Sequence, residues 1–583
     1  MKNLLTRMGA KITEYPKLFL SLSIVSAVFL LYWNVLGHPF VWDDYYVIVD
    51  NKYIQNWQYF LNLFSENTYE GSGSTGVNWR PAMLLVFSGL WHSIGPWSPA
   101  YHFTSIVFHA IDAVLLFVLF NLIFKRRYLA FISALLFAIH PLQTQAVTYI
   151  AGFGDPLSTF FMLSGAIFYI KSIKDEENRR RLLLATGLMQ ILALCSKESA
   201  VMMPGLLFLA DFFAKERGLT FWGDIKSSLK KILPFLGILA FYVLLRLTFL
   251  NFLGYLQVTS FATPLYERIF IFWSIFPEYL RLVFAPLHLH MEHTVYWVHS
   301  LFEPKTLLGL GIFSLFIFLI VKTWKHRPEV SFGLLWFFVA FSPNANIFMP
   351  STNLFGEHWL YLSLPGLFIA IFALANELFE KRKYFIALIF LLSLWVGWIS
   401  SIVISRNNEW KTSVSILTQT LEEEPKMVQV MIVLGNIYRD SGEHEKAFEL
   451  YDRAIQTEPT NPIVYSDRAK LWKKLGNEKE MVKNMERSVL LGPAYSPAFN
   501  PLVKYYERQG NLPKLKWLYE MRLTWAKEPK EALGISLKLA NIAVGQGNRA
   551  LAQKYLEKAE EFDKKLKKDP AVFLEGQLSK LFP

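Results

Sequence analysis

Two adjacent carboxylates, Asp43 and Asp44, are the residues of this chain whose type and spacing most readily suggest chemistry. Aromatic residues flank them, in a polar segment, residues 38–80, that ends at Arg80. Neighbouring residues of a helix or strand point in different directions, so the two carboxylates are not expected to act as a matched pair. We expect one to face a site and the other to orient it or bind an ion. A solvated turn is the alternative.

Further ionisable residues stand at the ends of apolar runs. Lys197 and Glu198 lie between two such runs, and Glu357 and His358 open a later one. Ionisable groups at a bilayer boundary are costly, so they are candidates for function. We expect these four residues and Arg80 to share a site with the acidic pair.

Single polar residues near the same boundary could support that site. His140 ends one apolar run, Asp155 opens the next, and His102 lies seven residues before His109, on the same helix face. For each lone histidine, packing inside the protein is the alternative explanation.

These residue types together favour glycosyl transfer from a lipid-phosphate sugar. A carboxylate can take the proton of an acceptor hydroxyl. Arginine and lysine can bind a phosphate leaving group and stabilise its charge. The lipid-linked sugar would be a co-substrate, and no cofactor is indicated with certainty. A divalent metal ion is compatible with the acidic pair, but adjacent acids are poor evidence for one, so no metal ligand is assigned.

The distribution of charge divides the chain near Ser405. From Arg406 to the end, 53 of 178 residues are charged, as in soluble domains, whereas the first 405 residues hold only another 53. The sequence therefore predicts an all-α protein with a polytopic membrane domain over 1–404, a connecting segment over 405–427 and a soluble module over 428–583. The single cysteine, Cys195, excludes an internal disulfide.

Apolar runs of about 20 residues predict eleven spans, give or take two. They are residues 17–37, 100–124, 128–148, 155–173, 181–197, 199–214, 232–250, 305–322, 330–349, 357–376 and 383–404. With a cytoplasmic N-terminus, every cluster of Lys and Arg between them falls on the cytoplasmic side, provided that 81–95 and 266–288 do not cross. Residues 38–80 then form the first external loop, and the C-terminal module is external.

The predicted concentration of Lys and Arg on the cytoplasmic side accounts for the net charge of +12, so a nucleic-acid partner is not needed to explain it. The lack of disulfides, of an organelle signal and of a retrieval tail favours a bacterial inner membrane over the endoplasmic reticulum.

The soluble module repeats every 34 residues. Gly442, Gly476 and Gly510 are spaced by 34, and so are Pro459 and Pro493. This is the tetratricopeptide period, and the pattern predicts about four repeats stacked into an α-solenoid with a concave binding surface.

The chain resembles the transmembrane and tetratricopeptide-repeat-containing O-mannosyltransferases, a branch of the C-type superfamily of polytopic glycosyltransferases. The resemblance covers nearly the whole chain. Its motifs are Phe40-Val41-Trp42-Asp43-Asp44 with Asn51, Trp79-Arg80-Pro81, Tyr101-His102 with His109, His140-Pro141 with Ala146-Val147, Ser196-Lys197-Glu198 with Pro204 and Asp211, Pro343-Asn344, Glu357 with Tyr361-Leu362, and Arg406-Asn407 with Trp410.

The resemblance implies a membrane enzyme that moves mannose from a polyprenyl phosphate to a protein hydroxyl on the external face. It implies that Asp43 or Asp44 is the acid-base residue and that Arg80, Lys197 and Glu357 lie at the donor site, with Arg406 in support. The chain departs from the family pattern at Gln145, Gly154 and His358, which bears on the donor contacts.

Other classes of protein fit less well. A non-catalytic scaffold that presents its repeats needs fewer spans and fewer polar groups between them. A glycan ligase or polymerase would carry its key residues in a long late loop, whereas the long polar loop here is the first. A transporter would show inverted repeats or paired broken helices, and neither is visible.

Overall fold

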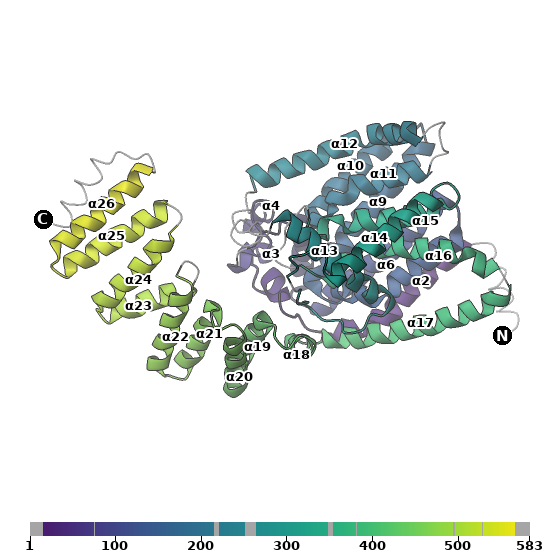
Figure 1. Cartoon of the computed structure of the whole chain (residues 1–583). Coiled ribbons are helices and arrows are strands. Elements are labelled where there is room, and N and C mark those ends of the chain that lie inside the picture. The colour runs from purple at the N-terminus through teal and green to yellow at the C-terminus, as the bar shows by residue number, and fades with distance from the viewer. Residues whose placement is uncertain are drawn as a thin grey trace. The chain divides into compact units, whose positions relative to one another are not determined.

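The computed structural model describes residues 16–74, 76–214, 221–250, 264–295, 297–347, 354–380, 382–493, 496–526 and 529–565 (Figure 1). Within these ranges the regular elements are helices and none is a strand, which confirms the all-α prediction. The chain divides into two compact units, Met1–Gln419 and Thr420–Pro583. The division falls inside the connecting segment predicted over 405–427.

The first unit is a bundle of apolar helices around one large hydrophobic core. Helix α9 packs along α10 and α6, α6 packs on α7, and α15 packs on α16. The longer helices are α2 (Pro16–Tyr32), α5 (Pro81–Ile94), α6 (Ser98–Phe124), α7 (Arg127–Ile139), α9 (Gly154–Lys174), α10 (Arg179–Ser196), α11 (Met203–Ala214), α12 (Phe221–Thr248), α13 (Leu265–Phe284), α14 (Pro304–Thr323), α15 (Pro328–Phe341), α16 (Leu364–Glu380) and α17 (Arg382–Glu409).

Several of these helices confirm a multi-pass membrane unit. Among the described residues, six helices are long and apolar enough to cross a bilayer, and the bent pair Arg127–Ile139 and Pro141–Val147 adds a seventh if it is one span. These seven correspond to predicted spans. The other four, 181–197, 199–214, 330–349 and 357–376, form α10, α11, α15 and α16, which are shorter or less apolar. The count of eleven stays a prediction.

Helices α15 and α16 cross at a pair of glycines. A Cβ atom on Gly333 would lie 2.3 Å from the carbonyl oxygen of Gly366, and one on Gly366 would lie 2.5 Å from that of Gly333. Backbone atoms cannot give way as side chains do, so this approach requires glycine on both helices. Beside the crossing, the indole of Trp336 donates to the Leu362 carbonyl oxygen at 2.8 Å and holds the chain just before α16.

Gly333→Ala should therefore destabilise the protein. Forcing a methyl group into this contact should lower the free energy of unfolding by about 1–3 kcal/mol. Thermal unfolding in detergent measures the effect. Gly397→Ala is the matched control, because a Cβ there would meet no atom within 4 Å and alanine favours the helix. Equal unfolding temperatures for the two variants would contradict the tight crossing.

The loop 38–80 folds in short helical turns, among them α3 (Lys52–Gln55) and α4 (Asn62–Ser65), and α3 packs on α5. Trp42 has a φ of +45°, which is rare for a bulky residue. Its backbone N–H donates to Ser413 Oγ at 3.0 Å. Its indole stacks on Tyr149, and Tyr149 stacks on Trp410, with centroid distances of 6.0 and 5.0 Å. Residues that follow α17 thus hold the loop in place.

The second unit is built from helix hairpins. Gly442, Gly476, Gly510 and Gly547 turn the chain between paired helices with φ values from +64° to +89°, where glycine is favoured. The spacing of the first three glycines is thereby explained, and the predicted α-solenoid architecture is confirmed. The helix pairs are α19 (Val428–Ser441) with α20 (His444–Thr457), α21 (Pro462–Lys474) with α22 (Glu478–Leu491), α23 (Phe499–Arg508) with α24 (Leu512–Trp525), and α25 (Pro529–Gly545) with α26 (Arg549–Lys565).

Candidate active site

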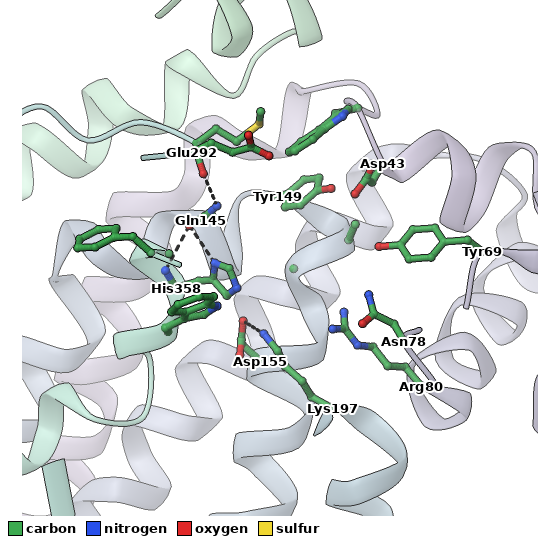
Figure 2. Close-up of a pocket in the computed structure, with 17 residues that line it drawn as sticks. Asp43, Tyr69, Asn78, Arg80, Gln145, Tyr149, Asp155, Lys197, Glu292 and His358 are labelled. Carbon is green, nitrogen blue, oxygen red and sulfur yellow. Dashed lines mark hydrogen bonds and ion pairs between the residues drawn. The ribbon is translucent and has the colours of Figure 1, made fainter. Parts of the chain in front are cut away.

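A polar cavity of about 210 Å³ opens where the loop 38–80 meets the ends of several helices of the first unit (Figure 2). The loop, the turn before α9, the end of α10, the chain after α13 and the chain before α16 all contribute side chains. The cavity is lined by Trp42, Asp43, Tyr69, Asn78, Arg80, Gln145, Tyr149, Ala151, Gly152, Asp155, Lys197, Met291, Glu292, Phe355, Gly356, His358 and Trp359.

The two adjacent carboxylates point to different places. Asp43 lines the cavity, whereas Asp44 is fully buried behind it. Asp44 accepts the backbone N–H of Val41 at 2.9 Å and that of Ala151 at 2.7 Å. It therefore ties the loop to the turn before α9 and directs Asp43 into the cavity.

The surroundings of Asp43 suit a proton acceptor. Burial raises the pKa of Asp43, although Tyr149 and the charge of Arg80 oppose the rise. A carboxyl group whose pKa lies above the ordinary value is a stronger base once it is ionised, so it can accept a proton from a hydroxyl more readily.

Asp44 should make stability depend on pH. Burial raises the pKa of Asp44 to about 8, against about 4 for an unfolded chain. The stabilisation by its proton is complete below about pH 4 and is lost as the pH rises through about 8, because the native state binds that proton more tightly. The unfolding temperature of the wild type should therefore fall between about pH 4 and 8. It should fall less in Asp44→Asn, whose amide does not titrate. Parallel curves for the two proteins would contradict this prediction.

Two cations lie across the cavity from Asp43, each paired with an acid. Lys197 Nζ lies 2.6 Å from Asp155 Oδ2, and Arg80 binds Glu198 through Nε at 3.1 Å. In Figure 2 the terminal nitrogens of Arg80 point into the cavity. Both cations are nearly buried, with side-chain exposures of 14% for Arg80 and 11% for Lys197. They can bind an anion that enters the cavity.

Glu198 acts on the position of Arg80. Its carboxylate accepts the backbone N–H of Trp79 at 2.9 Å as well as the guanidinium of Arg80. Burial opposes ionisation of Glu198, but the charges of Arg80 and Arg246 outweigh it and hold its pKa below the usual value. Glu198 is thus a positioning residue behind Arg80 and does not line the cavity.

Local structure brings the cations and Asp155 together. Asp155 lies in the first turn of α9, and Lys197 follows the last residue of α10 in extended conformation. A Cβ atom on Gly154 would lie 3.2 Å from the Ser196 carbonyl oxygen and 3.7 Å from the Arg80 and Lys197 side chains. The small residue lets the start of α9 approach the end of α10.

The opposite wall carries His358, Gln145 and Glu292. The side-chain oxygen of Gln145 lies 3.0 Å from His358 Nδ1 and accepts the His358 backbone N–H at 3.2 Å. Glu292 lies in the cavity wall (Figure 2), which Met291 also lines. Burial raises the pKa of Glu292, and the charge of Asp43 raises it further.

Besides Asp44 and Glu198, four more residues predicted for the site lie outside the cavity lining. Glu357 is turned away, and its carboxylate binds Arg406 at 3.4 Å and His293 at 3.1 Å. His140 Nε2 binds the Val283 carbonyl oxygen at 2.9 Å, and the ring of His102 packs edge-on against His38. The structure therefore brings Asp43, Arg80, Asp155, Lys197 and His358 together and places Glu357, Arg406, His102 and His140 behind the walls.

Four polar residues of the cavity, Asn78 among them, were not predicted as site residues from the sequence. Tyr69 and Tyr149 carry no motif, and Glu292 lies in a short polar segment between predicted spans. A search for charged residues in such segments, 288–293 among them, would have found Glu292.

Comparison with known proteins supports the architecture. Residues 435–476 match the TPR repeat. The chain is 25% identical to protein O-mannosyl-transferase TMTC3 of Mus musculus, over 83% of this chain and 56% of that protein. It is 25% identical to protein O-mannosyl-transferase F38B6.6 of Caenorhabditis elegans, over 75% of this chain and 63% of that protein. The resemblance to the O-mannosyltransferases with tetratricopeptide repeats is confirmed.

A shorter match has higher identity. Protein O-mannosyl-transferase Tmtc2 of Drosophila melanogaster is 31% identical over 38% of this chain and 24% of its own length. The chain spans between 56% and 63% of the first two curated relatives. The similarity to these transferases therefore extends through most of this chain but through only part of theirs.

Proposed function

We propose that the chain is a membrane glycosyltransferase that moves a sugar, mannose in the first instance, from a polyprenyl phosphate to a serine or threonine hydroxyl of a protein. The observation that carries this proposal is one cavity in which the carboxylate of Asp43 lies across from the cations Arg80 and Lys197. The names of the curated relatives support the same reaction class.

In the proposed reaction, Asp43 takes the proton of the acceptor hydroxyl. The hydroxyl oxygen attacks the anomeric carbon, and the bond from that carbon to the phosphate oxygen breaks. The phosphate leaves with the electron pair, so its charge grows in the transition state. Arg80 and Lys197 stabilise that charge. Attack from the side opposite the phosphate inverts the anomeric configuration.

Asp155 and Glu198 keep the two cations in position without the donor. A buried cation is costly unless it is paired, and each acid supplies the pair through its contact at 2.6 or 3.1 Å. A donor phosphate would then enter a site whose cations are already oriented. Such preorganisation lowers the energy of reorganisation during transfer.

The external face of the membrane is the proposed side of the reaction. Helix α9 begins at the cavity and ends at Lys174, and α10 begins at Arg179 and ends at the cavity. The basic ends of both helices thus lie away from the cavity, and basic residues collect on the cytoplasmic side. A polyprenyl-phosphate donor suits this face, and a bacterial inner membrane is the location we propose.

The repeats are the proposed binding site for the acceptor protein. Solenoids of this kind present extended concave surfaces to partners. One cavity of the second unit is lined by Lys473, Lys504 and Arg508 together with Met481 and Tyr505. Such a surface would bind an extended segment of the acceptor and raise its concentration near the enzyme.

The decisive experiment is transfer of radiolabelled mannose from polyprenyl-phosphate mannose to total membrane protein. Purified wild type is compared with the double variant Asp43→Asn, Asp44→Asn. Label transferred by the wild type and lost in the variant would support both enzyme and site. If no label is transferred from this donor, a panel of other lipid-phosphate and lipid-diphosphate sugars is tested. If the whole panel is silent, the proposal is wrong and a scaffold becomes the better explanation.

A further inference from the structure

A cluster of two histidines and one glutamate lies directly behind the cavity wall. His290, His293 and Glu357 each offer one ligand atom, and these atoms lie within 4.8 Å of one another. Glu357 is fully buried, His290 is 5% exposed, and the His293 side chain is 9% exposed. The proposed transfer reaction uses none of the three residues.

The hydrogen bonds of His290 prepare it as a ligand. His290 Nδ1 lies 2.7 Å from the carbonyl oxygen of His288. A carbonyl oxygen only accepts, so Nδ1 carries the hydrogen and the lone pair of the neutral ring is on Nε2. Metal-binding histidines commonly bind a backbone carbonyl oxygen in this way, which orients the ring and fixes its tautomer.

The other two residues converge on the same point. Glu357 Oε1 lies 3.1 Å from His293 Nε2 and accepts the backbone N–H of His290 at 2.6 Å. The ring centroids of His290 and His293 are 3.7 Å apart. The three side chains therefore meet at one point behind the wall.

Arg406 does not occupy the side of Glu357 that faces the histidines. Its guanidinium lies 3.4 Å from Glu357 Oε2, the other carboxylate oxygen, and it also binds Glu409. The positive charge of Arg406 is therefore balanced by Glu409. Glu357 Oε1 stays directed at the histidines.

We propose that His290, His293 and Glu357 bind a Zn²⁺ ion. Two imidazole nitrogens and one carboxylate oxygen are a ligand set that zinc accepts, with a fourth position for water. Mg²⁺ and Ca²⁺ prefer oxygen ligands, so two imidazole ligands make these ions a poor fit to the site. The ion would replace the direct contact between His293 Nε2 and Glu357 Oε1.

The site would brace the wall of the cavity. Met291 and Glu292, which lie between the two histidines, line the cavity, and so do Gly356 and His358 on either side of Glu357. One ion would thus join two chain segments that are 64 residues apart at the His293–Glu357 contact. It would hold Glu292 and His358 in place without taking part in sugar transfer.

The test is the metal content of untagged full-length protein purified in detergent without chelators. We expect about one Zn²⁺ per chain by mass spectrometry, and loss of the ion in His293→Ala. His299→Ala is the matched control, because His299 is 70% exposed and pairs with Glu267 instead; it should retain the ion.

A second measurement uses the wild type, in case His293→Ala fails to fold. A zinc chelator should lower the unfolding temperature, and added Zn²⁺ but not Mg²⁺ should restore it. After reconstitution with Co²⁺, the visible absorption of a four-coordinate ion should develop in the wild type and in His299→Ala. Protein without bound Zn²⁺ after reconstitution, or an unfolding temperature that chelation leaves unchanged, would overturn the proposal. So would zinc bound equally by His293→Ala, which would indicate adventitious binding.

Discussion

Asp43→Asn is expected to lower the rate of sugar transfer by about 100- to 10,000-fold, the range for loss of a general base. The asparagine amide keeps the size of the side chain but cannot take a proton from the acceptor. Because the Asp43 side chain lines the cavity and asparagine keeps its size, thermal stability should stay near that of the wild type. Single-turnover transfer with a saturating donor measures the rate.

The control for Asp43→Asn is Asp44→Asn. Asp44 accepts two backbone N–H groups, and an amide nitrogen would face one of them without bonding. The cost should be about 1–3 kcal/mol of stability, with a smaller loss of rate. If Asp44→Asn abolishes transfer while Asp43→Asn remains active, the roles are reversed. Full transfer by both variants would contradict the proposed mechanism.

The rate of the wild type should also depend on pH through Asp43. Only the ionised carboxylate can take a proton, and burial raises the pKa of Asp43. Transfer should therefore increase as the pH rises through that elevated value.

Lys197→Met is expected to have the second largest effect. It removes one of the two cations proposed to stabilise the leaving phosphate, a loss that should slow transfer by about 100- to 1,000-fold. It also leaves the buried carboxylate of Asp155 without the partner at 2.6 Å. That loss should cost about 3–5 kcal/mol of stability.

The double variant Lys197→Met, Asp155→Asn separates these two effects. Neither side chain is charged, so no buried charge is left unpaired and much of the stability should return. Transfer should stay as slow as in Lys197→Met. Recovery of the rate together with stability would show that Lys197 acts only in the fold and not on the phosphate.

Much of the architecture followed from periodic patterns. The 34-residue spacing of Gly442, Gly476 and Gly510 predicted the hairpin turns, because each needs the left-handed conformation that glycine favours. The apolar runs predicted helices. Several of these helices are too short or not apolar enough to be identified as membrane spans from length and composition alone. Charge density alone does not show that α17 continues to Glu409 or that Trp410 is buried.

The arrangement of the site could be predicted only in part. Because they are adjacent, the side chains of Asp43 and Asp44 must point in different directions. Which of them is buried is decided by the backbone N–H groups of Val41 and Ala151, which donate to Asp44. The partner of Lys197 is Asp155, 42 residues earlier. Glu357 binds Arg406 behind the cavity wall. Glu292 and Asp43 line the same cavity although they belong to distant chain segments, and no local sequence pattern connects those segments.

The contacts of the loop 38–80 also set the order in which the protein can mature during synthesis. Trp42 and Ser413 are separated by 371 residues along the chain. The ribosome makes the loop early and its partners late, and parts of a chain begin to fold from the N-terminus. The loop 38–80 can therefore take its final position only after α17 and Ser413 have been made. A nascent chain halted before that point would carry Asp43 and both cations and still lack an assembled site.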